Sequence, residues 1–444
     1  MTERELFAPY ISRRGMLRSG AMLGAGAALA GGPLAGPAFA QPEDWPALGA
    51  MLGEYVEGGK VANMALGLGW GQQYPEFLTA GETSFTSGVA VDADTLYRIY
   101  SMTKPITGMA AMICVDEGLM GLDQPIAEIL PAFAEMQVQK VYDGPITADN
   151  LEPATRPITI RNLLTHTSGL GYSIVQTGPL AEAYTDAGLV PGLVSRLQDL
   201  PVFRGTAVRS LELFADRLAE MPLVYQPGTK WSYSVGLDLM GRIIEVVSGQ
   251  AFDAFLKQRI FDPCGMTSTF FRVPESEAHR MTANYFVLNG TLLPIDLPHN
   301  SVFYDEPPFA FGGSGLVSTA RDYDRFLRML AGWGELDGAR VMSEEAVRLG
   351  TSDLFPDSMP EGEAFEFGGR QFGFGAAGLV GKDDAEGLYG WFGAAGTCGL
   401  VNLKWGLRHN LMTQYMPATT YPIYEQFALN AAQDAIPQLL GQRG

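Results

Sequence analysis

Ser101 and Lys104 form a Ser-x-x-Lys pattern whose residue types and spacing could carry nucleophilic chemistry. Of the seven lysines in the chain, only Lys104 has a serine three residues before it. Positions three apart lie on one face of a helix, so the hydroxyl and the ammonium can meet. A serine hydroxyl is a weak nucleophile near neutral pH, and a neighbouring lysine can take its proton or electrostatically favour another base.

The segment around this pair is predicted to be a buried helix. Pro105 falls in the first turn, where a missing N–H costs little, and the apolar run 106–115 ends before Gly118. Ser101 would then lie at a helix N-terminus, where free N–H groups favour developing negative charge. A lone Ser-x-x-Lys also arises by chance, so its meaning depends on the rest of the chain.

Two further segments could complete such a site. Tyr233 lies on a loop before a helix predicted at 236–248, and a nearby ammonium would favour its phenolate as a general base. Residues 390–396 are rich in glycine, so a backbone N–H there could join that of Ser101 in an oxyanion hole. From these residues alone, a packed tyrosine and a simple β-turn remain open alternatives.

The composition and net charge of the chain argue against several classes of protein. The 444 residues are 47% hydrophobic, which suits one large domain or two modest ones, and the net charge of −19 argues against nucleic acid and anionic membrane as partners. Three scattered cysteines and four histidines lack the spacing of a disulfide framework or a metal centre. We therefore expect neither a metal nor a cofactor.

The first 40 residues resemble an export signal. The twin arginines Arg13 and Arg14 precede a weakly hydrophobic Gly/Ala run, and Ala38-Phe39-Ala40 is a small-residue cleavage site. We expect removal of residues 1–40 after export of the folded chain, and hence a periplasmic or secreted protein. The body has no apolar run long enough to span a membrane, so no membrane anchor is expected.

The order of the predicted elements suggests one sheet built from both ends of the chain. The predicted helices lie at 44–57, 209–220, 236–248, 251–260, 320–332 and 422–440. The predicted strands lie at 64–70, 372–379, 388–392, 399–403 and 411–415. The middle of the chain would form an inserted, mostly helical domain.

The segment 97–108, YRIYSMTKPITG, resembles the nucleophile segment of the serine β-lactamase/penicillin-binding-protein superfamily. The similarity is to the branch of class C β-lactamases and family VIII carboxylesterases, and it covers nearly all of residues 45–435. Further matching segments follow in the same order along the chain at 122–131, 158–170, 233–235, 312–320 and 391–393.

The resemblance implies an α+β, β-lactamase-like fold, with an antiparallel sheet flanked by N- and C-terminal helices. The sheet domain would comprise 41–105 and 335–444, and the inserted helical domain 106–334. It also implies Ser101 as nucleophile, Lys104 and Tyr233 as its base, and the N–H groups of Ser101 and Ala394 as the oxyanion hole. His166, in the matching segment 158–170, would shape the cleft wall.

Two departures from the lactamase pattern bear on the substrate. Trp391, followed by Phe392 and Gly393, stands where lactamases carry the lysine that attracts a substrate carboxylate. Val235 stands where an asparagine usually contacts an amide of the substrate. With Trp391, Phe392, Gly393 and Val235 as substrate-binding residues, an apolar ester group would be favoured over an anionic lactam.

The sequence therefore predicts a serine hydrolase that cleaves small neutral carboxylic esters through an acyl-enzyme on Ser101. Four alternatives use the same acyl-enzyme: a β-lactamase, a D-amino-acid peptidase, an acyltransferase, and a penicillin-recognising protein that does not turn over. The sequence gives neither the natural substrate nor the oligomeric state.

Overall fold

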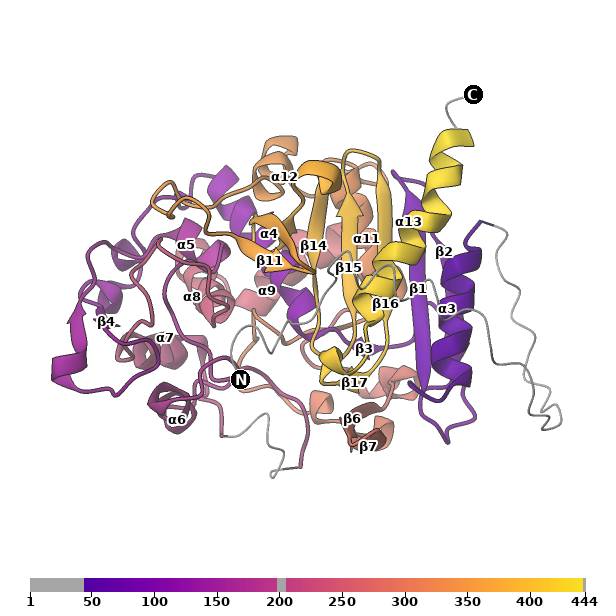
Figure 1. Ribbon diagram of the computed structural model, residues 1–444, viewed down its shortest axis with the longest axis horizontal. Helices are drawn as coiled ribbons and strands as arrows, with labels where there is room; N and C mark the ends of the chain where they lie inside the picture. The colour runs from indigo at the N-terminus through magenta and orange to yellow at the C-terminus, as the bar shows by residue number, and fades with distance from the viewer. Residues whose placement is uncertain (1–43, 198–204, 442–444) are drawn as a thin grey trace.

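The computed structural model describes residues 44–197 and 205–441 (Figure 1). The predicted export signal, residues 1–40, lies outside the described residues, so its assignment stays a prediction. Within 44–197 and 205–441, no helix combines the length and the hydropathy of a membrane-spanning segment. Within the same ranges, Cys114, Cys264 and Cys398 are all buried, free thiols.

An eight-stranded antiparallel sheet forms the centre of the molecule, in the order β11-β12-β13-β14-β15-β16-β1-β2. Its strands are β1 (Asn63–Trp70), β2 (Glu76–Gly81), β11 (Phe365–Phe367), β12 (Arg370–Phe374), β13 (Leu379–Val380), β14 (Leu388–Phe392), β15 (Cys398–Asn402) and β16 (Leu407–Met412). The early strand β1 pairs with the late strand β16, with Ala65 opposite Met412. Both ends of the chain therefore build one sheet, as predicted.

The first and last helices cover one face of this sheet. Helix α3 (Pro46–Glu57) packs against β1 and β2, and α13 (Ile423–Gly441) packs against α3 and β16 (Figure 1). The Asp434 carboxylate accepts hydrogen bonds at 3.0 Å from the backbone N–H groups of Ala47 and Leu48, which satisfies free donors at the start of α3. The predicted arrangement of a sheet flanked by N- and C-terminal helices is confirmed.

The opposite face carries α11 (Ala320–Ala331), which packs on β1, β15 and β16. A buried ion pair joins the two layers, since Arg408 Nε on β16 donates to Asp324 Oδ1 at 3.0 Å. Helix α11 falls within 106–334, the range assigned to the inserted domain, although it packs on the sheet. The domain limits 41–105, 106–334 and 335–444 stay a prediction.

The remaining helices lie mainly in the middle of the chain. They are α4 (Thr103–Asp116), α5 (Ile160–Leu164), α6 (Pro179–Asp186), α7 (Leu211–Ala219), α8 (Gly236–Ser248), α9 (Phe252–Leu256), α10 (Asp262–Cys264) and α12 (Glu344–Gly350). Small sheets pair β3 (Tyr97–Arg98) with β8 (Val317–Ser318), β4 (Gln137–Gln139) with β5 (Leu151–Pro153), β9 (Glu335–Leu336) with β10 (Ala339–Arg340), and β6 (Asn284–Leu288) with β7 (Thr291–Asp296) and β17 (Tyr415–Met416).

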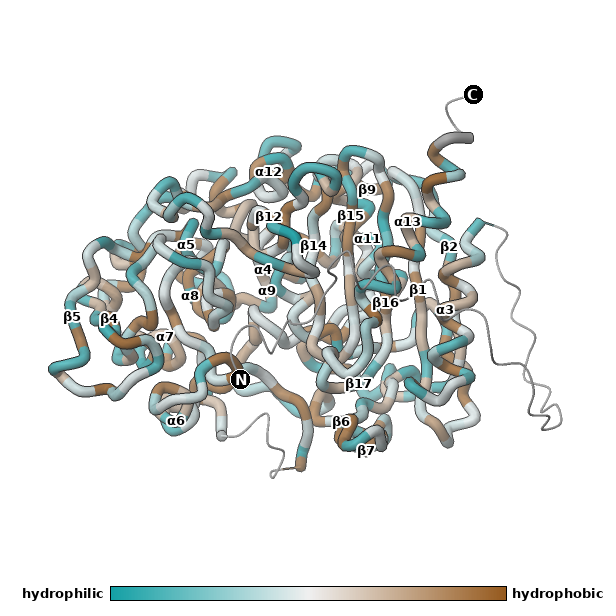
Figure 2. Tube along the Cα trace, viewed as in Figure 1, coloured by the Kyte–Doolittle hydropathy of each residue, from teal (hydrophilic) through white to brown (hydrophobic). Residues whose placement is uncertain are grey.

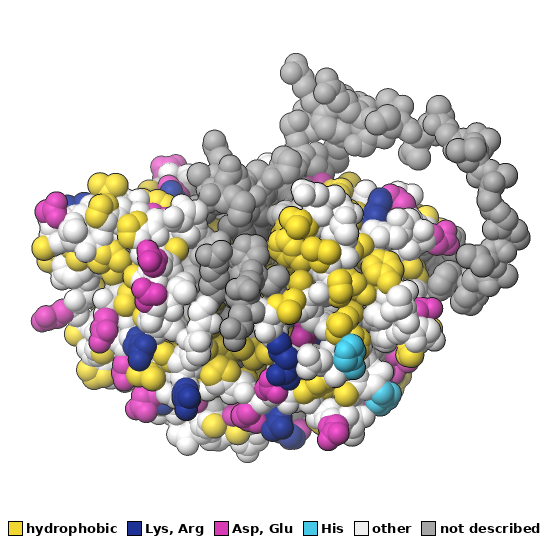
Figure 3. All heavy atoms as spheres, turned by 90° about the horizontal axis from the view of Figure 1, so that it is seen from below, with side chains coloured by type: hydrophobic (Ala, Val, Ile, Leu, Met, Phe, Trp, Pro, Cys, Tyr) yellow, Lys and Arg dark blue, Asp and Glu magenta, His cyan; other side chains and the backbone are white. Residues whose placement is uncertain are grey.

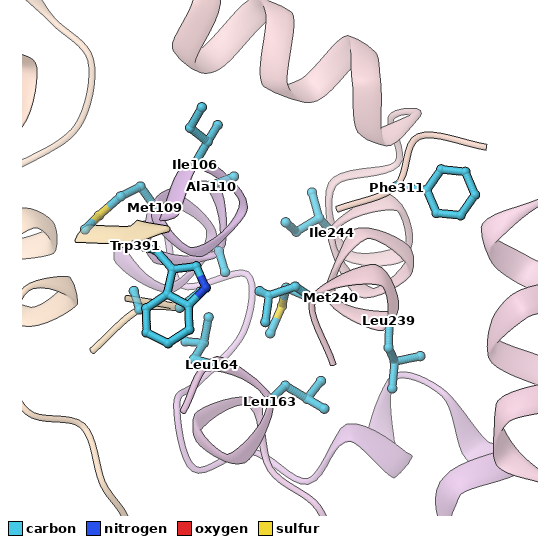
Figure 4. Close-up of a cluster of buried hydrophobic side chains, with 14 of the residues drawn as sticks. Ile106, Met109, Ala110, Leu163, Leu164, Leu239, Met240, Ile244, Phe311 and Trp391 are labelled. Atoms are coloured by element: carbon cyan, nitrogen blue, oxygen red, sulfur yellow. The ribbon is translucent and has the colours of Figure 1, made fainter. Parts of the chain in front are cut away.

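Helices α4 and α8 pack against each other in the main hydrophobic core. Figure 4 shows Ala110 on the side of α4 that is turned towards Met240 and Ile244 of α8, and Ile106 and Trp391 belong to the same cluster. Along α8, hydrophobic and hydrophilic residues alternate as in an amphipathic helix (Figure 2), whereas α4 is buried along nearly its whole length. The start of each of these two helices carries the residues that we expect to do chemistry.

Candidate active site

Ser101 lies in a single 3-10 turn, Tyr100–Met102, that runs directly into α4. Tyr100 has a φ of +41°, a left-handed conformation that residues other than glycine rarely adopt. Two contacts hold it there: its hydroxyl accepts a hydrogen bond from Asn284 Nδ2 at 3.0 Å, and its ring lies edge-on to Phe303. The turn leaves Ser101 partly exposed at the start of an otherwise buried helix, where a substrate can reach it.

Lys104 is fully buried, and its ammonium contacts the Ser101 hydroxyl. Nζ donates to Ser101 Oγ at 3.2 Å and to the carbonyl oxygen of Gly313 at 2.8 Å. It also lies 4.5 Å from the centre of the Tyr233 ring. The three residues that sequence reasoning selected as catalytic thus lie together, and their catalytic roles stay predictions.

Tyr233 is buried among aromatic rings just before α8. Its ring centre lies 4.8 Å from that of His166, 5.4 Å from that of Tyr172 and 5.8 Å from that of Trp391. The Trp391 indole N–H donates a hydrogen bond to Tyr233 Oη at 3.2 Å. An indole N–H can only donate, so this contact favours an electron-rich tyrosine oxygen.

The glycine-rich segment after β14 lies beside the nucleophile turn. A Cβ on Gly393 would lie 2.3 Å from the Ile99 carbonyl oxygen, so only glycine allows this close approach, two residues before Ser101. The backbone N–H of Ala394 has no hydrogen-bond acceptor among the described residues. A free N–H beside Ser101 is what an oxyanion hole needs, and this role of Ala394 and Ser101 stays a prediction.

The structure places two of the predicted substrate-binding residues beneath the surface. Trp391 is 2% exposed and packs against Phe365 and Phe374, and Val235 is 1% exposed at the start of α8. Phe392 is half-buried. Other rings cover Trp391, so its side chain lies in the core beside the Tyr233 hydroxyl. Substrate contact by Trp391, Phe392, Gly393 and Val235 stays a prediction.

His166 is a buried neighbour of the base rather than a group open to substrate. Burial, and then the Lys104 charge, lower the pKa of His166 well below its ordinary value, so the imidazole is neutral near pH 7. Its Nδ1 lies 3.1 Å from Ser234 Oγ, and its Nε2 has no hydrogen-bond partner among the described residues. A neutral ring beside Tyr233 agrees with a packing role.

Sequence reasoning missed Asp238, a fully buried residue in the first turn of α8. Burial raises the pKa of Asp238 to about 6, against the opposing effects of a hydrogen bond from the Gly313 N–H and of Lys104. An acidic residue in the first turn of a helix usually faces solvent and the helix dipole, so its spacing from Tyr233 alone did not mark it.

A separate cavity of about 830 Å³ lies away from this cluster. Its lining includes Arg242, Phe252, Phe271 and Glu306, and none of the predicted site residues. This cavity is therefore separate from the site around Ser101.

The profile of the β-lactamase family matches residues 48–432 of the chain. This chain belongs to the β-lactamase family. The match spans both strands that bring the chain ends together and the Ser101–Lys104 contact. The predicted β-lactamase-like fold and the predicted superfamily are therefore confirmed, and the protein is a serine hydrolase of this family.

Three curated proteins have sequences similar to that of this chain. Protein Rv1367c of Mycobacterium tuberculosis is 36% identical over 71% of this chain and 77% of its own length. Lovastatin esterase of Penicillium rubens is 31% identical over 67% and 72% of the two chains. Esterase EstB of Burkholderia gladioli is 29% identical over 74% and 79%.

Solved structures of low identity share the fold. Simvastatin synthase of Aspergillus terreus, in a mutant form, superposes with a TM-score of 0.70 at 22% identity, covering 91% of this chain and 96% of its own. EstCE1, a hydrolase with promiscuous acyltransferase activity, gives 0.68 at 20%, covering 87% and 97%. A family VIII carboxylesterase gives 0.64 at 18%, covering 89% and 99%.

Proposed function

We propose that this β-lactamase family member cleaves small neutral carboxylic esters through an acyl-enzyme on Ser101. The observation that carries the proposal is the contact of Ser101 Oγ with Lys104 Nζ, with Tyr233 beside them and the Trp391 N–H on its oxygen. Two of the similar proteins are named as esterases, which supports the same chemistry.

In the proposed reaction, Ser101 Oγ bonds to the ester carbonyl carbon while the Tyr233–Lys104 pair takes its proton. The backbone N–H groups of Ser101 and Ala394 stabilise the oxyanion of the tetrahedral intermediate. The bond to the alcohol oxygen then breaks, and the alcohol leaves with the proton held by the pair. Water attacks the acyl-serine in the same way, which releases the acid and restores Ser101.

The preference for neutral esters follows from the charges at the site. Lys104 is already bound to Ser101 Oγ and the Gly313 carbonyl, and its Nζ lies over the Tyr233 ring. Trp391 occupies the position of the lysine that anchors a carboxylate in lactamases, and its N–H is directed to Tyr233. An anionic substrate would therefore lack its usual partner at this position.

A comparison of ester and lactam turnover tests the proposed function. Loss of two polar anchors, each worth about 1–3 kcal/mol, predicts that kcat/KM for penicillins falls about 10²–10⁴-fold below that for short neutral esters. The measurement is kcat/KM for p-nitrophenyl butyrate, for a penicillin and for the cephalosporin nitrocefin on one preparation. A lactam value equal to or above the ester value would support a β-lactamase instead.

Acyl transfer is a second candidate, because simvastatin synthase and EstCE1 share the fold and the acyl-enzyme can react with an alcohol in place of water. Product analysis after reaction with a p-nitrophenyl ester in the presence of an added alcohol separates the two. Free acid as the main product supports the esterase, and a new ester as the main product supports the acyltransferase.

Trp391→Phe is expected to lower kcat/KM for esters by about 10–100-fold. The substitution keeps an aromatic ring and removes the N–H that donates to Tyr233 Oη, and a hydrogen bond to a charged oxygen is worth about 1.5–3 kcal/mol. The same measurement on Phe374→Leu, which alters the ring packing without touching the hydrogen bond, is the matched control. Equal losses in the two variants would assign Trp391 to packing alone.

We also propose that the protein is exported and acts on small molecules rather than on nucleic acid. The twin-arginine pattern within residues 1–40 and the net charge of −19 support this proposal. On the face shown in Figure 3, acidic and basic side chains of the described residues are interspersed among hydrophobic ones. N-terminal sequencing of the protein from the culture medium and periplasm tests removal of the first 40 residues.

A further inference from the structure

Asp238 is linked to the Lys104 ammonium through a single residue of the chain. Asp238 Oδ1 accepts a hydrogen bond from the backbone N–H of Gly313 at 2.9 Å. The carbonyl oxygen of the same Gly313 accepts one from Lys104 Nζ at 2.8 Å. Both side chains are fully buried, so solvent does not screen this line of contacts.

The second oxygen of this carboxylate has no hydrogen-bond partner among the described residues. Buried polar atoms are normally hydrogen-bonded, and an unpaired carboxylate oxygen lowers the stability of the folded state. A Cβ built on Gly313 would lie 2.9 Å from Asp238 Oδ2, so the carboxylate packs directly on the Gly313 backbone. A buried carboxylate with one unpaired oxygen lowers the stability of the fold, so its presence at this position is better explained by a role in function.

We propose that Asp238 is a positioning residue for Lys104: its carboxylate fixes the Gly313 backbone, whose carbonyl holds the ammonium against Ser101. The inference rests on the proposed function, because it assigns Asp238 a role in the same proton transfer. The negative charge of the Asp238 carboxylate also balances the positive charge of the buried Lys104 ammonium, since the two groups act on each other electrostatically.

The groups that face Asp238 come from several elements. Lys104 of α4 favours its ionised form, and Tyr172, in the segment between α5 and α6, has its own pKa raised by burial and then by Asp238. The charged side chains of the other helices packed on α8 are at least partly exposed. They are Arg161 of α5, Glu212, Asp216 and Arg217 of α7, and Asp253 of α9. Lys104 is thus the buried cation that acts on this carboxylate.

Asp238→Asn tests the electrostatic part of the proposal, because it keeps an oxygen that can accept from the Gly313 N–H and removes the negative charge beside the Lys104 ammonium. With p-nitrophenyl butyrate at pH 8, kcat is expected to fall at least about tenfold while KM stays within about threefold. As pH falls from 8 to 5, Asp238 of the unaltered enzyme takes up a proton around pH 6. The ratio of kcat between the unaltered enzyme and the variant should therefore shrink towards one.

The thermal midpoint provides a readout that separates positioning from a structural role. The pKa of Asp238 in the folded state is raised to about 6 from 3.8, so the ionised carboxylate destabilises the fold above pH 6. Asp238→Asn should therefore have an equal or higher Tm at pH 8, together with its lower kcat. A lower Tm with unchanged kcat would make Asp238 a structural residue and contradict the proposal.

Asp322→Asn is the matched control. Asp322 is also buried, also lies in the first turn of a helix, and has its pKa raised to about 6, chiefly by burial. Its carboxylate accepts from the Ser268 N–H and the Thr269 hydroxyl, away from the Lys104 contacts. We expect Asp322→Asn to leave the pH profile of kcat unchanged. Matching profiles for the two variants would overturn the proposal.

If Asp238→Asn does not fold, Gly313→Ala tests whether the contact between Asp238 and Gly313 is needed for activity. Its Cβ must displace the Asp238 carboxylate, and Gly313 does not have the positive φ that would itself exclude alanine. A lower kcat at pH 8 supports the proposal, and an unchanged kcat contradicts it. Ser101→Ala is measured alongside, since an active Ser101→Ala would refute the proposed function itself, whereas its inactivity leaves Asp238 as the point under test.

Discussion

Ser101→Ala is expected to lower kcat/KM for neutral esters by at least about 10³-fold. The substitution removes the hydroxyl that lies 3.2 Å from Lys104 Nζ, and no other serine in the chain has a lysine three residues later. Ser101 is partly exposed, so its loss leaves the core under α4 in place and Tm should change little.

Ser210→Ala is a suitable control for this experiment. The Ser210 hydroxyl accepts a hydrogen bond from the backbone N–H of Leu213 at 3.1 Å at the start of α7. Its loss should cost about 1 kcal/mol of stability and leave ester turnover unchanged. Near-normal activity in purified, folded Ser101→Ala would remove the basis of the proposed mechanism.

Lys104→Ala and Tyr233→Phe should each lower kcat by at least about 10³-fold, and the double variant should be scarcely worse than either. The physical reason is that the two groups act as one base: Lys104 Nζ lies 4.5 Å from the Tyr233 ring and also contacts Ser101 Oγ. Either single substitution breaks the same proton transfer. The measurement is kcat for p-nitrophenyl butyrate across the double-mutant cycle.

Lys104 is fully buried, so Lys104→Met is the control for packing, because methionine keeps most of the volume without the charge. It should be as inactive as Lys104→Ala and more stable. Losses that multiply in the double variant would mean that Lys104 and Tyr233 act independently.

Elements with a strong local pattern were predicted closely. Strand β14 has the predicted limits, Leu388–Phe392, and α8 has the predicted limits, Gly236–Ser248, with Gly249 in the left-handed conformation that ends helices. Strand β14 is a short apolar run and α8 has apolar residues at helical spacing, and glycine or polar residues lie at or next to the ends of both. The nucleophile contact was predictable for a similar reason, since a three-residue helical spacing fixes which side chains meet.

Packing partners could not be deduced from periodicity. The helix at 320–332 was predicted, but its apolar stripe gives no sign of whether it covers the sheet or a helical domain. The helix predicted at 251–260 is α9 followed by a π-helical segment, Lys257–Phe261, a backbone change without a periodic signature. Conversely, Asn289-Gly290 is a strong hairpin signal, and the β6–β7 hairpin that it joins was absent from the prediction.

At the candidate active site, too, local patterns were predictable and contacts between distant segments were not. Residue type and order brought Ser101, Lys104 and Tyr233 together, whereas the burial of Trp391 depends on Phe365 and Phe374 from other strands. Asp238 depends on Gly313, 75 residues away, and only the folded chain reveals that contact. Distant partners of this kind decide which polar residues are buried, and one sequence does not display them.

Identification of the acylated residue tests directly whether Ser101 is the nucleophile. The protein is mixed with p-nitrophenyl butyrate, quenched in acid during the burst of p-nitrophenol release, digested, and analysed by mass spectrometry. We expect one butyryl group per chain, on Ser101, that disappears as turnover is completed. A butyryl group on another residue, or a burst of p-nitrophenol without any acylated Ser101, would contradict this expectation.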